Sequence, residues 1–435
     1  MASVNPPLTI EGLSEEAWFP KAAARALEPA AVKVPEGFEA WRLHTEFDSM
    51  LMAWPSGDIE SADWWGRVIP VGGGGKRWGS PPELDGASFH RMEGMQEPTV
   101  RITQKEGSNL IAKILPLDGS GHARKLAEIG SDNLRVSVGG IQVSNRDLIV
   151  FYEETDCKTA FEVADEAIAN GDFVAAADIC QEAGAALGRF HCDALTYRSE
   201  PNDERRWNDR LKQLEDRLKT NTLWRAPHTK WTTLTLTHRN FGLELVDVID
   251  EETCIVTCYF DGVPNAILPK SRGFPVVRDL AAGYRSISRL AEIHDLVYDK
   301  WLGDGHWRSQ KPTSVQLQET ERYLRMRFFS GWRSEVNKVL NTSKSLDGNK
   351  GGVPVWEYEQ VLEEIAFHRA WGLTTPDRVT WWMEHVNRIQ AILGVNQTIG
   401  AVGYAGIIAS IGLFFVDFGL TYDLKVAGIV GSALF

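Results

Sequence analysis

Leu236-Thr-His-Arg-Asn240 is a polar interruption between runs of alternating and apolar residues. Thr and Leu alternate before it, over 232–236, and the segments 243–249 and 254–260 follow it. Short apolar runs separated by polar residues predict paired strands. The sequence therefore predicts a short loop-and-hairpin unit, with His238 and Asn240 in its loop.

Nearer the N-terminus, the segment 98–115 predicts another β-hairpin. Its strands are an alternating run at 99–104 and an apolar run at 110–115, joined by the turn Glu106-Gly-Ser-Asn109, and the second strand carries Lys113. The next segments predict a helix, a strand and two helices, at 121–129, 141–152, 160–191 and 202–219. This order of elements is typical of an α+β fold with two lobes.

Three motifs make the interpretation specific, and they occur in the order Leu187-Gly-Arg-Phe-His191, Leu236-Thr-His-Arg-Asn240 and Asp279-Leu-Ala281. In sequence and spacing they resemble the aminoglycoside and choline phosphotransferase family, whose fold is protein-kinase-like. The resemblance covers about 98–293, somewhat under half of the 435 residues.

The resemblance implies a two-lobed kinase-like fold with additions at both ends. The predicted parts are a Trp-rich N-terminal extension (1–95), a kinase-like N-lobe (96–155), a helical C-lobe (156–385) and an apolar C-terminal segment (386–435).

The resemblance also implies ATP and Mg²⁺ as cofactors and assigns roles to several residues. Lys113 matches the strand lysine that contacts the α- and β-phosphates, and Glu128 on the following predicted helix is the acid expected to pair with it. His238 and Asn240 match the catalytic loop, with Asn240 in the position of the catalytic aspartate. The alternative for His238 is a core histidine that holds the loop backbone by a hydrogen bond, and for Asp279 a helix cap.

The same alignment shows where the catalytic loop departs from the family. A neutral amide at Asn240 cannot accept a hydroxyl proton as a carboxylate does. Leu245 stands where the family has a metal-binding Asn, and its side chain offers Mg²⁺ no oxygen. Tyr259 aligns with the metal-binding aspartate unless a two-residue shift brings Asp261 into its place.

Composition limits the classes of partner. The formal net charge of -13 gives no basic footprint for a nucleic-acid backbone, so no nucleic acid is expected. The five cysteines are scattered and odd in number, which favours a reducing compartment. The N-terminus lacks the basic-then-apolar order of a secretory signal, so a cytoplasmic location is expected.

The segment 389–416 contains no charged residue and is long enough to cross a bilayer. It is a candidate membrane anchor that would leave the protein on the cytoplasmic face, because Arg378 and Arg388 precede it and Lys425 alone follows. The alternative is a buried helix of a soluble protein, since its glycines lower both helix propensity and hydrophobicity.

Three functional hypotheses follow. The first is a catalytically impaired kinase-like protein that acts as a binding, assembly or regulatory module with a protein partner. The second is an active ATP-dependent small-molecule phosphotransferase with a rearranged loop, in which Asp247, Asp250 or Asp261 holds Mg²⁺. The third is a structural subunit of a membrane complex.

Overall fold

The computed structural model describes most of the chain up to residue 376. The described residues are 8–70, 75–93, 97–117, 121–197, 204–220, 236–250, 253–257, 263–268, 274–294, 315–339, 352–376 and the single residues Val379, Met383 and Gly403. Contacts divide the chain into two units, 1–221 with 225–376, and 222–224 with 377–435. Every described stretch lies in the first unit.

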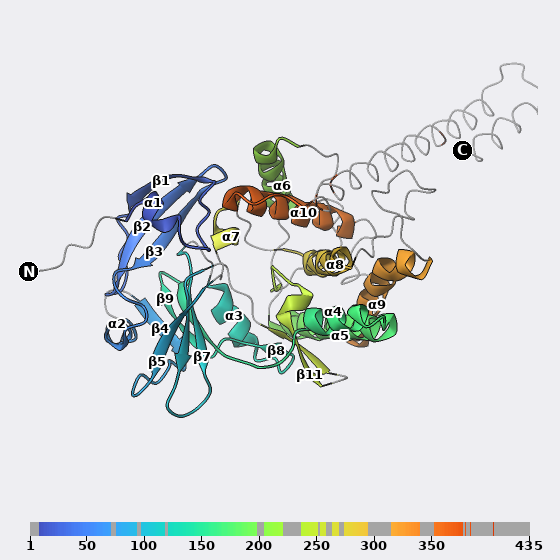
Figure 1. Ribbon diagram of the computed structural model, residues 1–435, viewed down its shortest axis with the longest axis horizontal. Helices are drawn as coiled ribbons and strands as arrows, with labels where there is room; N and C mark the ends of the chain where they lie inside the picture. Colours follow the sequence, from blue (N-terminus) through green and yellow to red (C-terminus); the bar gives the residue numbers. More distant parts are fainter. Residues whose placement is uncertain are drawn as a thin grey trace, which may run out of the picture. The chain divides into compact units, whose positions relative to one another are not determined.

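A three-stranded antiparallel sheet follows the short helix α1 (Ile10–Leu13) near the N-terminus (Figure 1). Its strands are β1 (Ala24–Pro29), β2 (Phe38–Thr45) and β3 (Ser49–Pro55), in that order. β2 buries Trp41 and Leu43 on one face and Phe38 on the other, because side chains alternate along a strand.

A six-stranded antiparallel sheet in the order β4-β9-β10-β7-β6-β5 forms the N-terminal lobe. Its strands are β4 (Gly75–Gly79), β5 (Ser88–Met92), β6 (Thr99–Thr103), β7 (Leu110–Ile114), β9 (Gly139–Val143) and β10 (Arg146–Glu153). The central strands β7 and β10 are almost wholly buried, as their apolar composition requires. This sheet begins at Gly75, before the predicted boundary between residues 95 and 96.

The helix α2 (Ala62–Val68) joins the two sheets through its tryptophans. Trp65 stacks on Phe89 of β5 with ring centroids 5.6 Å apart, and Trp64 contacts Phe38 of β2. The Trp-rich segment is therefore core of the N-terminal lobe rather than a separate appendage.

The helical lobe surrounds a small mixed sheet that carries the predicted loop-and-hairpin unit. β11 (Val246–Asp250) and β12 (Thr253–Thr257) form the hairpin, and β8 (Leu134–Arg135) joins parallel to β12. The short helices η2 (Leu243–Leu245) and α7 (Val263–Ala266) flank this hairpin. The longer helices are α3 (His122–Ile129), which precedes β8, then α4 (Ala160–Ala169), α5 (Phe173–Tyr197), α6 (Glu204–Leu218), α8 (Val276–Ile293), α9 (Val315–Val339) and α10 (Gly352–Trp371).

The first 70 residues also contact the helical lobe. The backbone N–H groups of Ala22 and Ala23 both donate to the carbonyl of Ala370 at the end of α10. The Trp371 indole Nε1 donates to the carbonyl of Ala17 at 3.0 Å. The N-terminal segment thus contacts both lobes.

The predicted apolar segment 389–416 lies outside the described residues, apart from Gly403. None of the helices that the structure describes combines the length and hydrophobicity needed to span a bilayer.

Candidate functional site

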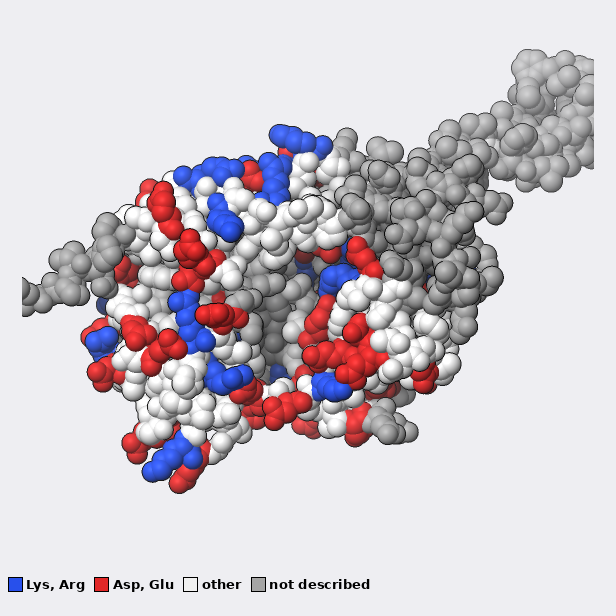
Figure 2. All heavy atoms as spheres, viewed as in Figure 1, with Lys and Arg blue, Asp and Glu red and all other residues white. Residues whose placement is uncertain are grey.

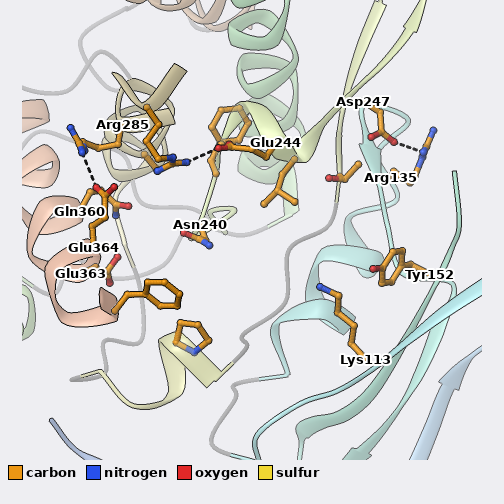
Figure 3. A pocket seen from close by; sticks show the side chains of 18 of the residues that line it. Lys113, Arg135, Tyr152, Asn240, Glu244, Asp247, Arg285, Gln360, Glu363 and Glu364 are labelled. Atoms are coloured by element: carbon orange, nitrogen blue, oxygen red, sulfur yellow. Dashed lines mark hydrogen bonds and ion pairs between the residues drawn. The ribbon is translucent and has the colours of Figure 1, made fainter. Parts of the chain in front are cut away.

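A cavity of about 670 Å³ lies between the strands of the N-terminal lobe and the helical lobe. The face in Figure 2 is hollowed between these parts, and charged side chains of both signs surround the hollow. Figure 3 shows Lys113 and Tyr152 pointing into the cavity from the strands, opposite Arg285 and Glu364, with Asn240 between them. This volume is in the range of small-molecule and cofactor sites.

Lys113 lies on β7 and is paired with a buried acid. Its Nζ is 2.5 Å from Glu97 Oε1, and the ammonium lies 5.9 Å from the centroid of the Tyr152 ring. Glu128, the acid expected to pair with Lys113, instead forms an ion pair with Arg124 on its own helix, at 2.9 Å. The carboxylate beside the lysine therefore comes from the segment before β6 rather than from α3.

The register of the sheet shows which loop lies near Lys113. Lys113 pairs with Thr99, the first residue of β6, so the connection from β5 to β6 meets the sheet at the lysine end. The turn Glu106-Gly-Ser-Asn109 joins the opposite ends of β6 and β7, roughly 13 Å away along the strands. That turn, with its single glycine, therefore does not lie beside Lys113.

The loop containing Asn240 is fastened by one buried carboxylate. Asp279 Oδ2 accepts the backbone N–H of His238 at 2.7 Å, and Oδ1 accepts that of Arg239 at 2.9 Å. Asp279 is the fourth residue of α8, whose N-cap is Pro275, so Asp279 does not cap that helix. Its carboxylate fixes the loop that presents Asn240 to the cavity.

A chain of hydrogen bonds sets the tautomer of the His191 ring. The Trp332 indole donates to His191 Nδ1 at 3.0 Å, so the other nitrogen, Nε2, carries the proton donated to Asp279 at 3.1 Å. Burial alone would raise the pKa of Asp279, but hydrogen bonds from His191 and the loop lower it overall. Asp279 is thus held as a carboxylate.

Two more buried histidines hold the same loop. His238 Nε2 lies 2.6 Å from the carbonyl of Thr257, and His122 Nε2, on α3, lies 2.9 Å from the carbonyl of Thr237. A carbonyl only accepts, so each Nε2 is the donor. Burial lowers the pKa of both histidines. The loop-holding interpretation of His238 agrees with this geometry.

Two arginines one turn apart on α8 line the helical wall of the cavity. Arg285 pairs with Glu364 of α10 at 2.7 Å, and Arg289 pairs with Glu244 at 2.8 Å (Figure 3). The Ser286 hydroxyl donates to Glu244 and accepts the backbone N–H of Leu243. These pairs balance the charges on this wall.

No family model and no curated protein matches the sequence. Among solved structures, glucosamine kinase bound to glucosamine, ADP and inorganic phosphate aligns with a TM-score of 0.54 at 13% identity, over 88% of this chain and 99% of that chain. Crystal form B of glucosamine kinase aligns with a TM-score of 0.53 at 13% identity, over 85% and 95% of the two chains. Choline kinase from Cryptosporidium parvum Iowa II aligns at a TM-score of 0.41 and 10% identity, over 72% and 91%.

The chain has a protein-kinase-like fold. The predicted two-lobed α+β architecture is confirmed by the alignment with glucosamine kinase, which includes nearly all of that enzyme. The resemblance to small-molecule phosphotransferases is thereby confirmed at the level of fold. An identity of 13% carries nothing further about activity or substrate.

The cavity contains some of the predicted site residues but not others. In protein kinases a strand lysine contacts the nucleotide phosphates and a catalytic-loop aspartate accepts the hydroxyl proton. Lys113 and Asn240 line this one cavity, whereas His238 lies behind the loop and Glu128 is not among the lining residues. The cavity thus brings together two of the four predicted residues that the structure describes.

The described residues do not fit a Mg²⁺ site. Leu245 lines the cavity with a hydrocarbon side chain, and the Asp247 carboxylate is held in an ion pair by Arg135. No group of three or more His, Cys, Asp or Glu side chains in the described part of the chain is arranged to hold a metal. Asp250, at the exposed end of β11, is not among the residues that line the cavity. Asp261 and Tyr259 lie outside the described residues.

Proposed function

We propose that this chain is a kinase-like nucleotide-binding protein that does not transfer phosphate and acts as a binding or regulatory module toward a protein partner. The observation that carries the proposal is Asn240, presented to the cavity by an intact loop in the position of the proton acceptor. Lys113, which would contact the phosphates, lines the same cavity.

Buried contacts hold the loop in place, and Asn240 supplies an amide at the position where the resembled family has a carboxylate. Asp279, His238 and His191 maintain a buried hydrogen-bond network whose effect is to fix the loop backbone. An amide in the acceptor position can bind a hydroxyl but cannot take its proton, which removes a contribution of about 10²–10⁴ in rate. Such a site supports ligand binding better than turnover.

Ligand binding at this cavity has a route to the rest of the molecule. Glu153, the last residue of β10, and Thr155, in the segment from β10 to α4 that joins the lobes, both line the cavity. A ligand held from both sides would change the population of lobe arrangements by its differential affinity for them. A protein partner that contacts both lobes would sense that change.

A second candidate is an active phosphotransferase that uses Asp247. This residue lines the cavity, and burial, the largest influence, raises the pKa of its carboxyl although Arg135 opposes the shift. A raised pKa makes a carboxylate a better proton acceptor. The ion pair with Arg135 would have to open first.

The substitution Asn240→Asp tests the proposal directly. We expect ATP turnover with an amino-sugar and amino-alcohol acceptor panel to be near background in the wild type and to rise at least tenfold in the variant. Asn145→Asp, which adds the same charge at an exposed turn, is the control and should change nothing. Wild-type turnover that is abolished by Asp247→Asn would favour the second candidate.

A further inference from the structure

Glu97 is a buried carboxylate in the segment just before β6, beside Lys113. Its side chain is 5% exposed and that of Lys113 is 20% exposed, so the ion pair between them is largely removed from water. Two hydrogen bonds fix the backbone that follows its Cα: the Thr99 hydroxyl donates to the carbonyl of Glu97, and Ile114 N–H donates to the carbonyl of Pro98. Glu97 is thus positioned by the strands β6 and β7.

The helix α3 offers no comparable carboxylate. Glu128 is 43% exposed and lies one turn from Arg124, with which it pairs. The helix is fixed to the sheet by other contacts, since Ala123 N–H donates to Asp147 Oδ2 at 3.0 Å and Arg124 contacts Gln142. The placement of α3 does not depend on an ion pair with Lys113.

In protein kinases the strand lysine is oriented by a glutamate on the helix that follows it, and movement of that helix controls activity. We propose that Glu97 takes over this positioning role, so that Lys113 is oriented from the segment that leads into β6 and independently of α3. The effect of Glu97 on nucleotide affinity rests on the proposed nucleotide-binding function. The pairing of Glu97 with Lys113 can be measured without nucleotide.

Separating the two buried charges is costly. A buried carboxylate that loses its cation is left uncompensated, so Glu97 favours conformations in which Lys113 stays beside it. The lysine then presents its ammonium at one place along the cavity wall before any ligand arrives. Preorganisation of this kind reduces the ordering cost of ligand binding.

The test compares Glu97→Gln with the matched variant Glu128→Gln in the full chain. Calorimetry with Mg-ATP should give a Kd raised about tenfold in Glu97→Gln and unchanged in Glu128→Gln. An unchanged or lower Kd in Glu97→Gln would overturn the proposal, and a lower one would mean that Glu97 competes with the phosphates. If Glu97→Gln folds poorly, Glu97→Asp is the alternative variant. Because it keeps the carboxylate, its Kd for Mg-ATP should lie between those of the wild type and Glu97→Gln.

A second readout separates this inference from the proposed function. The pH profile of Lys113 acylation, followed by mass spectrometry without nucleotide, should shift to lower pH in Glu97→Gln because the ammonium loses its counter-charge. The profile should stay in place in Glu128→Gln. If the wild type binds no ATP the proposed function fails, and the acylation profile alone then decides the pairing: a shift confined to Glu97→Gln supports it, and no shift overturns it.

Discussion

Arg239 shows at the scale of single residues how strongly the loop is constrained. Its backbone is in the left-handed region with φ 76°, which most residues other than glycine avoid. The Asp279 carboxylate accepts its N–H, and the Arg278 guanidinium donates to its carbonyl, so both peptide groups around it are held. The surrounding contacts therefore maintain a backbone conformation that is intrinsically unfavourable for arginine.

Asp279→Asn should therefore be costly despite its small change in shape. An amide has one acceptor oxygen, so at least one of the three groups that donate to the carboxylate loses its partner in a buried site. We expect a loss of about 3 kcal/mol in the free energy of unfolding, measured by urea titration. Asp178→Asn, at a half-exposed carboxylate paired with Arg327, should cost less than about 1 kcal/mol. Equal losses in the two variants would contradict this account of the loop.

The neutral histidines predict a dependence of stability on pH. The pKa of buried His122 lies well below its ordinary value of 6.5, so under mildly acidic conditions the unfolded chain binds a proton that the folded chain does not. The free energy of unfolding therefore decreases as the pH falls below about 6.5, by at most about 1.4 kcal/mol per pH unit for each such histidine. Urea titrations at pH 7.5, 6.0 and 5.0 should show this fall.

His122→Gln is the variant that assigns the effect. Its amide can still donate to the carbonyl of Thr237 but does not titrate, so the fall below pH 6.5 should become shallower. An identical pH dependence in wild type and variant would mean that other groups cause it.

The packing of α5 against α9 is the main contact between elements of the helical lobe. Gly184 of α5 and Gly331 of α9 lie at the crossing, where an added Cβ would stand 2.0 Å from the Phe328 carbonyl oxygen and 1.8 Å from the Gln181 carbonyl oxygen, respectively. Side chains at these positions would force the backbones apart. Glycine at these two positions allows the backbones of α5 and α9 to approach closely.

Gly184→Ala should destabilise the protein by about 1–3 kcal/mol through overpacking. Gly66→Ala is the matched control, because an added Cβ on that helical residue meets nothing within 4 Å and should stabilise by up to about 1 kcal/mol. Thermal unfolding of both variants checks the contrast. A stabilised Gly184→Ala would show that the helices can separate without loss.

The motifs around His191, Asn240 and Asp279 were enough to predict the loop, its hairpin and the helices on either side, because each is local in sequence. The pairing of Lys113 with Glu97 was missed, since Glu128 had the expected spacing and only strand register brings Glu97 beside the lysine. A buried acid two residues before a strand is a weak signal in sequence.

Pairing between residues that are distant in sequence also determines larger elements, and local patterns do not indicate it. The strand β4 lies within the segment predicted to be an N-terminal extension, yet it pairs with β9 across about sixty intervening residues. Asp279 was expected either as a motif residue or as a cap, and its contacts with a loop about forty residues away could not be read from spacing.

At the scale of the whole molecule, the N-terminal segment contacts both lobes that border the cavity. Its strands join the sheet lobe through Trp64 and Trp65, and its backbone bonds to Ala370 at the end of α10. A ligand that draws the lobes together would therefore also change the contacts that the N-terminal segment makes with each lobe. This gives the cavity a physical connection to a surface that a protein partner could contact.

Calorimetric titration of the full chain with Mg-ATP tests the central claim most directly. The account predicts saturable binding that is lost in Lys113→Ala and retained in Lys105→Ala, an exposed lysine of the same lobe, with no ATP turnover in the wild type. Absence of binding at millimolar ATP, or binding that Lys113→Ala leaves unchanged, would contradict it.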